Sequence, residues 1–180
     1  IISNYNEPEI TVDNLEIAQF IYMLINNKNI RSIIETVATK AILILGSFSD
    51  SDKVILDAIR DELRHHDYVP IVFDFDKPNN RDLTETVYTL ALLARYIIVD
   101  LTNASSVPHE LATIVPNIPS IPIQPIILAG NRQYSMFEHF SRYDWVLPRF
   151  EYKSKDHLMA NIRDRILQPL SEKLKEIRST

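Results

Sequence analysis

Four short apolar segments recur along the chain at nearly constant spacing. They begin at residues 41, 69, 96 and 123, so successive segments start 28, 27 and 27 residues apart. The stretches between them carry apolar residues at helical intervals, as Val54, Ala58 and Leu63 do, which predicts amphipathic helices. Short apolar strands that alternate with such helices are typical of a parallel sheet covered by helices on both faces.

We therefore expect an α/β fold with a five-stranded parallel sheet. The expected strands are 41–45, 69–75, 96–99, 123–128 and 145–147. Right-handed crossovers leave few topologies for such a sheet, and we favour the flavodoxin-like strand order 2-1-3-4-5. A long amphipathic helix should follow the last strand, with Leu158, Leu170 and Leu174 on its apolar face. Pro169 should kink or interrupt that helix.

Residues 1–40 precede the first strand and form an N-terminal segment, whereas 41–180 form the α/β domain. The segment starts as a polar linker, and a helix then begins at Asp13, with Glu16 as a capping-box-like partner. A second short helix follows over residues 30–37. Helices this short are not stable alone, so their apolar face must be covered. We expect it to pack on the α/β domain, because sequential elements usually touch; docking on a partner or on a neighbouring copy is the alternative.

The composition excludes several classes of site. The chain has 180 residues, of which 46% are apolar and 24% are charged, and this balance fits one globular domain. It contains no cysteine, which excludes disulfides, a thiol nucleophile and thiolate metal sites. Only Gly46 and Gly130 are glycines, too few for a Walker A loop or a G-x-G-x-x-G fingerprint. The histidines have no metal-ligand spacing, so we expect no metal site.

Charge and hydropathy limit the partners. The net charge is −5, and nucleic acid is not an expected partner because phosphate neutralisation needs a basic face. No apolar run approaches the ~18 residues of a membrane span, and no signal segment opens the chain. We expect a cytoplasmic protein without a membrane partner. Because the first residue is Ile1, not Met, we also expect the chain to be part of a longer protein.

The predicted strand order places a ligand site at one edge of the sheet. The direction of winding switches between strands one and three, and ligands bind at such a point, outside the carboxyl ends of the strands. The loops that would meet there are 46–52, 74–82 and 100–110. They are rich in Ser, Thr, Asp and Asn and carry an aromatic residue, Phe48, which suits them to hold a sugar and stack on a base.

Several runs in these loops match a known family in order and position. The run ILGSFS at 44–49 is similar to a first strand with a Ser-aromatic-Ser turn, and DFDKPNNRD at 74–82 stands where a long loop follows the second strand. ARYIIV at 94–99 resembles the segment that enters the third strand. SSVPHEL at 105–111 stands where the family has Ser, then Trp-Cys, then Glu-Leu. From about residue 41 to 152 the chain resembles the bacterial branch of the Toll/interleukin receptor (TIR) domain family.

This resemblance implies a function. In catalytic members of the family, the glutamate at the position of Glu110 cleaves the nicotinamide–ribose bond of NAD. NAD+ would then be a substrate, no cofactor would be bound, and the chain would be an N-glycosyl hydrolase. The resemblance also implies a homo-oligomer activated by self-assembly in antiphage defence or cell suicide. Similar chains follow pentapeptide repeats in bacterial proteins, so an upstream pentapeptide-repeat region is expected.

Glu110 is the candidate catalytic residue. Cleavage of the glycosidic bond passes through an oxocarbenium-like ribosyl cation, which a carboxylate beneath the ribose can stabilise. The alternative interpretation is an acid in the first turn of a helix, where it interacts favourably with the macrodipole.

The same loops supply seven candidate substrate-binding residues: Ser47, Phe48, Ser49, Asp74, Arg81, Asp100 and His109. The phenylalanine ring could stack on nicotinamide or adenine, and the serines could bind a ribose or phosphate. The arginine could pair with a diphosphate, Asp100 could hold a hydroxyl, and the histidine could tune Glu110. Each also has a purely structural interpretation, such as a helix N-cap for a serine or a turn cap for Asp100.

Three functions remain open on the sequence alone. The first is an NAD-cleaving TIR-like hydrolase, the second a non-catalytic TIR-like assembly module, and the third a nucleoside or nucleotide N-glycosidase of related fold. Val107-Pro108 stands in place of the family's Trp-Cys pair, which favours the second and third functions. The glutamate at position 110 favours a catalytic function, because a scaffold does not require an acid there.

Overall fold

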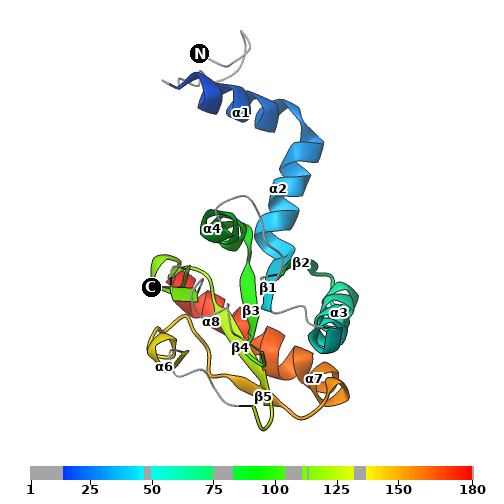
Figure 1. Ribbon diagram of the computed structural model, residues 1–180. Helices are drawn as coiled ribbons and strands as arrows, with labels where there is room; N and C mark the ends of the chain where they lie inside the picture. The colour runs from blue at the N-terminus through cyan, green and yellow to red at the C-terminus, as the bar shows by residue number, and fades with distance from the viewer. Residues whose placement is uncertain are drawn as a thin grey trace.

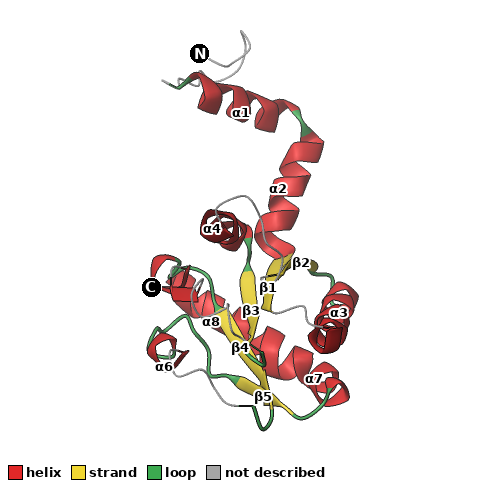
Figure 2. Ribbon diagram, viewed as in Figure 1, coloured by secondary structure: helices red, strands yellow, loops and turns green. Residues whose placement is uncertain are grey.

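The computed structural model describes residues 14–46, 50–74, 83–103, 111–112, 114–131 and 137–179. Within these residues, five parallel strands form one sheet in the order β2-β1-β3-β4-β5 (Figure 2). The strands are β1 (Ala41–Gly46), β2 (Val69–Asp74), β3 (Tyr96–Asp100), β4 (Ile123–Leu128) and β5 (Phe150–Tyr152). The flavodoxin-like strand order predicted from the sequence is therefore confirmed.

Helices cover both faces of the sheet. One face is covered by α3 (Asp50–His65), α7 (Lys155–Asn161), the π-helical turn η2 (Ile162–Leu167) and α8 (Gln168–Ser179). The other face is covered by α4 (Leu83–Leu93), the short 3-10 helix η1 (Val115–Asn117) and α6 (Phe137–Phe140). Two hydrophobic layers, one on each side of the sheet, result from this arrangement.

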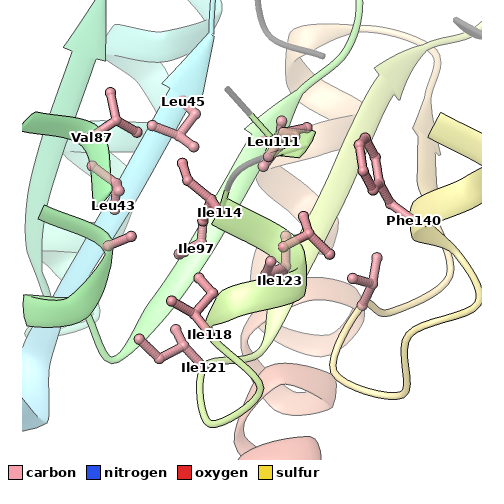
Figure 3. Close-up of a cluster of buried hydrophobic side chains, with 14 of the residues drawn as sticks. Leu43, Leu45, Val87, Ile97, Leu111, Ile114, Ile118, Ile121, Ile123 and Phe140 are labelled. Carbon is pink, nitrogen blue, oxygen red and sulfur yellow. The ribbon is translucent and has the colours of Figure 1, made fainter. Parts of the chain in front are cut away.

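Alternate residues of each strand supply the two layers. In β1, Leu43 and Leu45 point into the layer shown in Figure 3, while Ile42 and Ile44 belong to the opposite layer. All four side chains have no exposed surface. This is why β1 has a continuous apolar run: a strand buried on both faces has no position left for a polar side chain.

The fifth strand lies later in the chain than predicted, and the expected strand at 145–147 is wrong. Val146 forms only an isolated bridge to Ile123 at the start of β4. The ladder along β4 resumes where Phe150 pairs with Ile126. Pro148 separates the two contacts, and because proline has no N–H it cannot continue a hydrogen-bonded ladder.

The C-terminal helical region is interrupted next to Pro169, as predicted. The π-helical turn η2 separates α7 from α8, and the N–H of Gln168 bonds to the carbonyl of Arg163, five residues earlier. Proline lacks the N–H of a helical bond, and its ring crowds the carbonyl four residues before it. The wider turn accommodates that ring: the α-helical hydrogen-bond pattern is interrupted, while the backbone stays helical from Lys155 to Ser179.

Two helices precede the sheet, α1 (Leu15–Asn26) and α2 (Lys28–Lys40). The side chain of Asn14 caps α1, accepting hydrogen bonds from the N–H groups of Glu16 at 2.9 Å and Ile17 at 3.0 Å. The helix was expected to begin at Asp13, which lies outside the described residues. Asparagine takes the capping position one residue later because its carbonyl oxygen reaches the free N–H groups of the first turn.

The expected packing of the N-terminal segment on the α/β domain is wrong for α1. Figure 1 shows α1 standing away from the sheet at the far end of α2. Within residues 14–40 no side chain is buried. The last turn of α2 is tied to the domain through an ion pair between Lys40 and Asp67 and a hydrogen bond from Arg95 to the carbonyl of Thr39. None of the helices within the described residues combines the length and apolarity that crossing a bilayer would require.

A tyrosine beside the start of β2, Tyr68, makes the free energy of unfolding sensitive to pH in the alkaline range. The rings of Tyr68 and Tyr96 lie 6.1 Å apart, and the guanidinium of Arg95 lies 5.2 Å from the Tyr96 ring. Burial raises the pKa of Tyr68 above its ordinary value of 10.0; Tyr96 adds to this shift and Arg95 partly opposes it. The folded state therefore favours the neutral phenol.

We expect the free energy of unfolding to fall as pH rises above about 10. The stabilisation is fully present below the unfolded-state pKa, near 10, and is lost as the pH rises through the higher folded-state pKa. Denaturant titrations between pH 8 and 11 measure this loss, which Tyr68→Phe should reduce. Tyr22→Phe, an exposed tyrosine on α1, is the matched control. An identical pH profile for wild type and Tyr68→Phe would contradict the assignment.

Candidate functional site

Strands β1, β2 and β3 end together at one edge of the sheet. In the strand register Gly46 pairs with Asp74, and Leu45 pairs with Val99, one residue before the end of β3. In the sheet, β2 lies on one side of β1 and β3 lies on the other, so the direction in which successive strands are added reverses after β2. The structure therefore contains the switch point at which open α/β sheets bind ligands.

Gly46 lets two elements approach closely at this edge. A Cβ atom added to Gly46 would lie 3.3 Å from Cδ2 of Leu56, on α3, and 3.5 Å from Cβ of Asp100. The first of these contacts is tighter than ordinary packing allows. The glycine that ends β1 thus allows Leu56 of α3 to pack closely against it, whereas the contact with Asp100 would be of ordinary van der Waals length.

Asp100 is the candidate site residue whose side chain the structure describes. It lies at the carboxyl end of β3 and is only 5% exposed. Its Oδ1 atom accepts hydrogen bonds from the backbone N–H of Thr102 at 2.9 Å and from the Thr102 hydroxyl at 2.6 Å. A buried acidic group needs such donors, because burial without them is costly. Asp100 therefore caps the turn after β3, which is the structural interpretation that the sequence left open beside binding of a hydroxyl.

Thr102 connects Asp100 to the neighbouring strands. Its hydroxyl oxygen accepts a hydrogen bond from the N–H of Leu128 at 3.0 Å and lies 3.1 Å from the hydroxyl of Tyr152. A threonine hydroxyl has one hydrogen, which it donates to Asp100, so the tyrosine must be the donor of the second contact. The carbonyl of Thr102 also accepts a bond from Asn131 at 3.0 Å. The network joins the ends of β3, β4 and β5.

Sequence reasoning missed three members of this network: Thr102, Asn131 and Tyr152. A local signal existed for Thr102, because a hydroxyl residue two positions after an aspartate at a strand end is typical of a side-chain-capped turn. No local signal existed for Asn131 and Tyr152, which lie 29 and 50 residues farther along the chain. Only the strand order brings them to Asp100.

Most of the predicted site residues fall outside the described part of the chain. They are Ser47, Phe48, Ser49, Arg81, His109 and Glu110. The backbone of Asp74 ends β2 beside Gly46. Leu111, which follows Glu110 in the sequence, has no exposed surface and belongs to the core shown in Figure 3. Among the described residues, no group of three His, Asp or Glu side chains could hold a metal ion.

Comparison with known proteins identifies the fold. No family model matches the chain, and no curated protein matches it. A diflavin flavoprotein A3 from Nostoc sp. is similar in structure, with a TM-score of 0.56 and 12% identity over 76% of this chain and 97% of that chain. The lysine decarboxylase LdcF from Francisella novicida has a TM-score of 0.51 and 18% identity, over 75% of this chain but only 17% of the decarboxylase. Likenesses at these identities show the fold alone.

Proposed function

We propose that the chain is a TIR-like NAD+ glycohydrolase that cleaves the nicotinamide–ribose bond, is activated by self-assembly, and acts in bacterial antiphage defence or cell suicide. The observation that best supports this function is the buried carboxyl group of Asp100 at the switch point of the sheet. The motif resemblance around 44–49 and 105–111 is the second support.

The reaction requires negative charge beneath the ribose. When the N-glycosidic bond breaks, nicotinamide leaves with the bonding electron pair as a neutral molecule, and positive charge develops on the ribosyl C1′ and ring oxygen. Water then adds to C1′ and releases a proton, giving ADP-ribose. In this proposal Glu110 stabilises the ribosyl cation, and Asp100 accepts a hydrogen bond from a ribose hydroxyl.

The bonds around Asp100 suit it to such a role. The backbone N–H and the hydroxyl of Thr102 both donate hydrogen bonds to Oδ1 of Asp100. The Thr102 hydroxyl oxygen in turn accepts hydrogen bonds from Leu128 N–H and from the Tyr152 hydroxyl. An acceptor fixed before the substrate arrives does not have to reorganise during the reaction, and preorganised groups of this kind contribute most to electrostatic catalysis.

The function is tested by incubating the concentrated chain with NAD+ and measuring free nicotinamide by chromatography. The proposal expects nicotinamide and an ADP-ribose product. Parallel incubations with nucleosides and nucleotides measure the release of free base. Base release with NAD+ left intact would instead identify a nucleoside or nucleotide N-glycosidase. No product from any of these substrates would favour the non-catalytic assembly module.

We expect activity per molecule to rise with protein concentration. A neighbouring protomer packed against the loop 74–82 would exclude water from the site; residues 75–82 lie outside the described part of the chain. The measurement is the rate of nicotinamide release divided by protein concentration over a wide dilution series. A rate strictly proportional to protein, with a monomer observed throughout, would contradict activation by assembly.

A further inference from the structure

Helix α1 is apolar over most of its circumference, and its polar side chains, Glu16, Gln19 and Asn26, lie on one side. Its sequence, LEIAQFIYMLIN, contains one charged residue, Glu16, in twelve positions. Six of its large apolar side chains are exposed, from 39% for Ile25 to 73% for Leu15: Leu15, Ile17, Phe20, Tyr22, Met23 and Ile25. A short helix with this much exposed apolar surface is stable only when that surface is covered. Twelve residues are too few to cross a bilayer, which takes about 20, so a protein surface should cover α1.

The same chain contains an apolar groove of about 580 Å³ at the amino ends of the strands, opposite the edge that carries Asp100. It lies between α2, α4, α8 and the segment before β4. Aliphatic side chains line most of it, including Ile33, Val37, Leu92 and Leu93. Ile33 and Leu92 are 62% and 54% exposed. The groove therefore has the apolar character that α1 needs.

The charges of the two surfaces are also complementary. The groove is lined by two cations, Arg95 and Arg178. The single charge of α1 is the acidic Glu16, in its first turn. An apolar helix with one acid thus matches an apolar groove with two bases.

The elbow between α1 and α2 prevents α1 from reaching the groove of its own chain. A single residue, Asn27, separates the helices; its N–H bonds to the carbonyl of Met23, and its side chain caps α2 by bonding to the N–H groups of Asn29 and Ile30. Arg31 also bonds to the carbonyl of Ile25 across the elbow. Two antiparallel helices need a loop of about 2–5 residues. With one residue between them, α1 cannot fold back against the side chains of α2 that line the groove.

We propose that α1 of one copy occupies the groove of a second copy, and that α1 of the second copy occupies the groove of the first. A reciprocal contact of this kind gives a closed two-fold dimer, and short hinges are known to favour exchange of elements between copies. At roughly 100 Å² for each large apolar side chain, α1 and the groove together would bury on the order of 1,000 Å² per protomer, above the ~800 Å² of a stable interface. This dimer does not depend on the proposed enzymatic function.

The first test measures the oligomeric state of the 180-residue chain by sedimentation velocity. We expect a dimer at tens of micromolar or below, and a rise of at least about a hundredfold in its dissociation constant for Phe20→Asp or Leu92→Asp, because each buries a charge at an apolar contact. The control is Val54→Asp on α3, a side chain that is 56% exposed but lies outside both surfaces. All three sites are exposed, so circular dichroism should report folded variants. A monomeric wild type would overturn the proposal, as would a dimer weakened equally by the control.

The second test distinguishes exchange from other dimers. Inserting Gly-Ser-Gly-Ser after Asn27 would let α1 fold back on its own chain, so we expect a monomer. The same insertion after Gly130, in an exposed turn, is the control and should leave the dimer intact. A dimer that persists in the variant with the insertion after Asn27 would contradict the exchange of α1 between copies. Residues 1–13 are the other candidate occupant of the groove. If deleting them abolished the dimer, that result would also contradict the exchange of α1.

Discussion

Glu110→Gln should reduce nicotinamide release from NAD+ by at least about a hundredfold and leave the fold intact. The substitution keeps the shape of the side chain and removes its negative charge. Removing one preorganised group that stabilises a transition-state charge costs about a hundred- to a thousandfold in rate. Single-turnover chromatography of nicotinamide measures the loss. The free energy of unfolding should change by no more than about 0.5 kcal/mol, as expected for the exposed helix start that the sequence predicts for Glu110.

The matched control for this experiment is Glu85→Gln. Glu85 is an exposed acid in the first turn of α4, so the control makes the same change at a described helix start, the kind of position that the sequence predicts for Glu110. We expect it to retain wild-type turnover. A Glu110→Gln chain with full activity would remove Glu110 from the mechanism. An equal loss in both variants would point to a general effect of charge.

Thr102→Val should lower the free energy of unfolding by about 2–4 kcal/mol. Valine has the same shape but no hydroxyl, so Leu128 N–H and Tyr152 lose an acceptor and Asp100 loses a donor. Each buried group left without a partner costs about 1–3 kcal/mol, and the partial exposure of Thr102 limits the sum. Urea unfolding, with the slope compared between variants, measures the change.

Thr102→Ser is the control, because it keeps the hydroxyl and removes only a methyl group. Its loss of stability should be well below that of the valine variant. If the proposed function is right, nicotinamide release should also fall in Thr102→Val and persist in Thr102→Ser, because only the serine still donates to Asp100. A valine variant as stable as wild type would show that the hydroxyl does not hold the three strands together.

The order of the strands could be predicted because burial on both faces leaves a strong signal. β1, β3 and β4 are covered by helices on each side, so nearly every residue in them is apolar. An edge strand carries a weaker signal. β5 has only three residues and includes the exposed Glu151. The apolar run at Val146 is more conspicuous, and it predicts the strand at the wrong place.

The position of the candidate site followed from strand order, but its network did not. Asp100 was predicted because it ends a buried strand at the switch point. Tyr152 and Asn131 were missed because side chains so distant in sequence show no local periodicity that relates them to Asp100. Their contacts depend on the register of β4 and β5, which is set by packing across the whole sheet.

The sequence by itself determined the α/β class, the strand order, the interruption at Pro169 and the place of Asp100 at the sheet edge. These follow from hydrophobic periodicity and from the backbone limits of proline, both of which are local properties. Only the tertiary structure decided where the fifth strand pairs, which groups hold Asp100, and that α1 stands away from the domain. These depend on which distant surfaces meet, and for α1 on an elbow of one residue that keeps an apolar helix from the groove of its own chain.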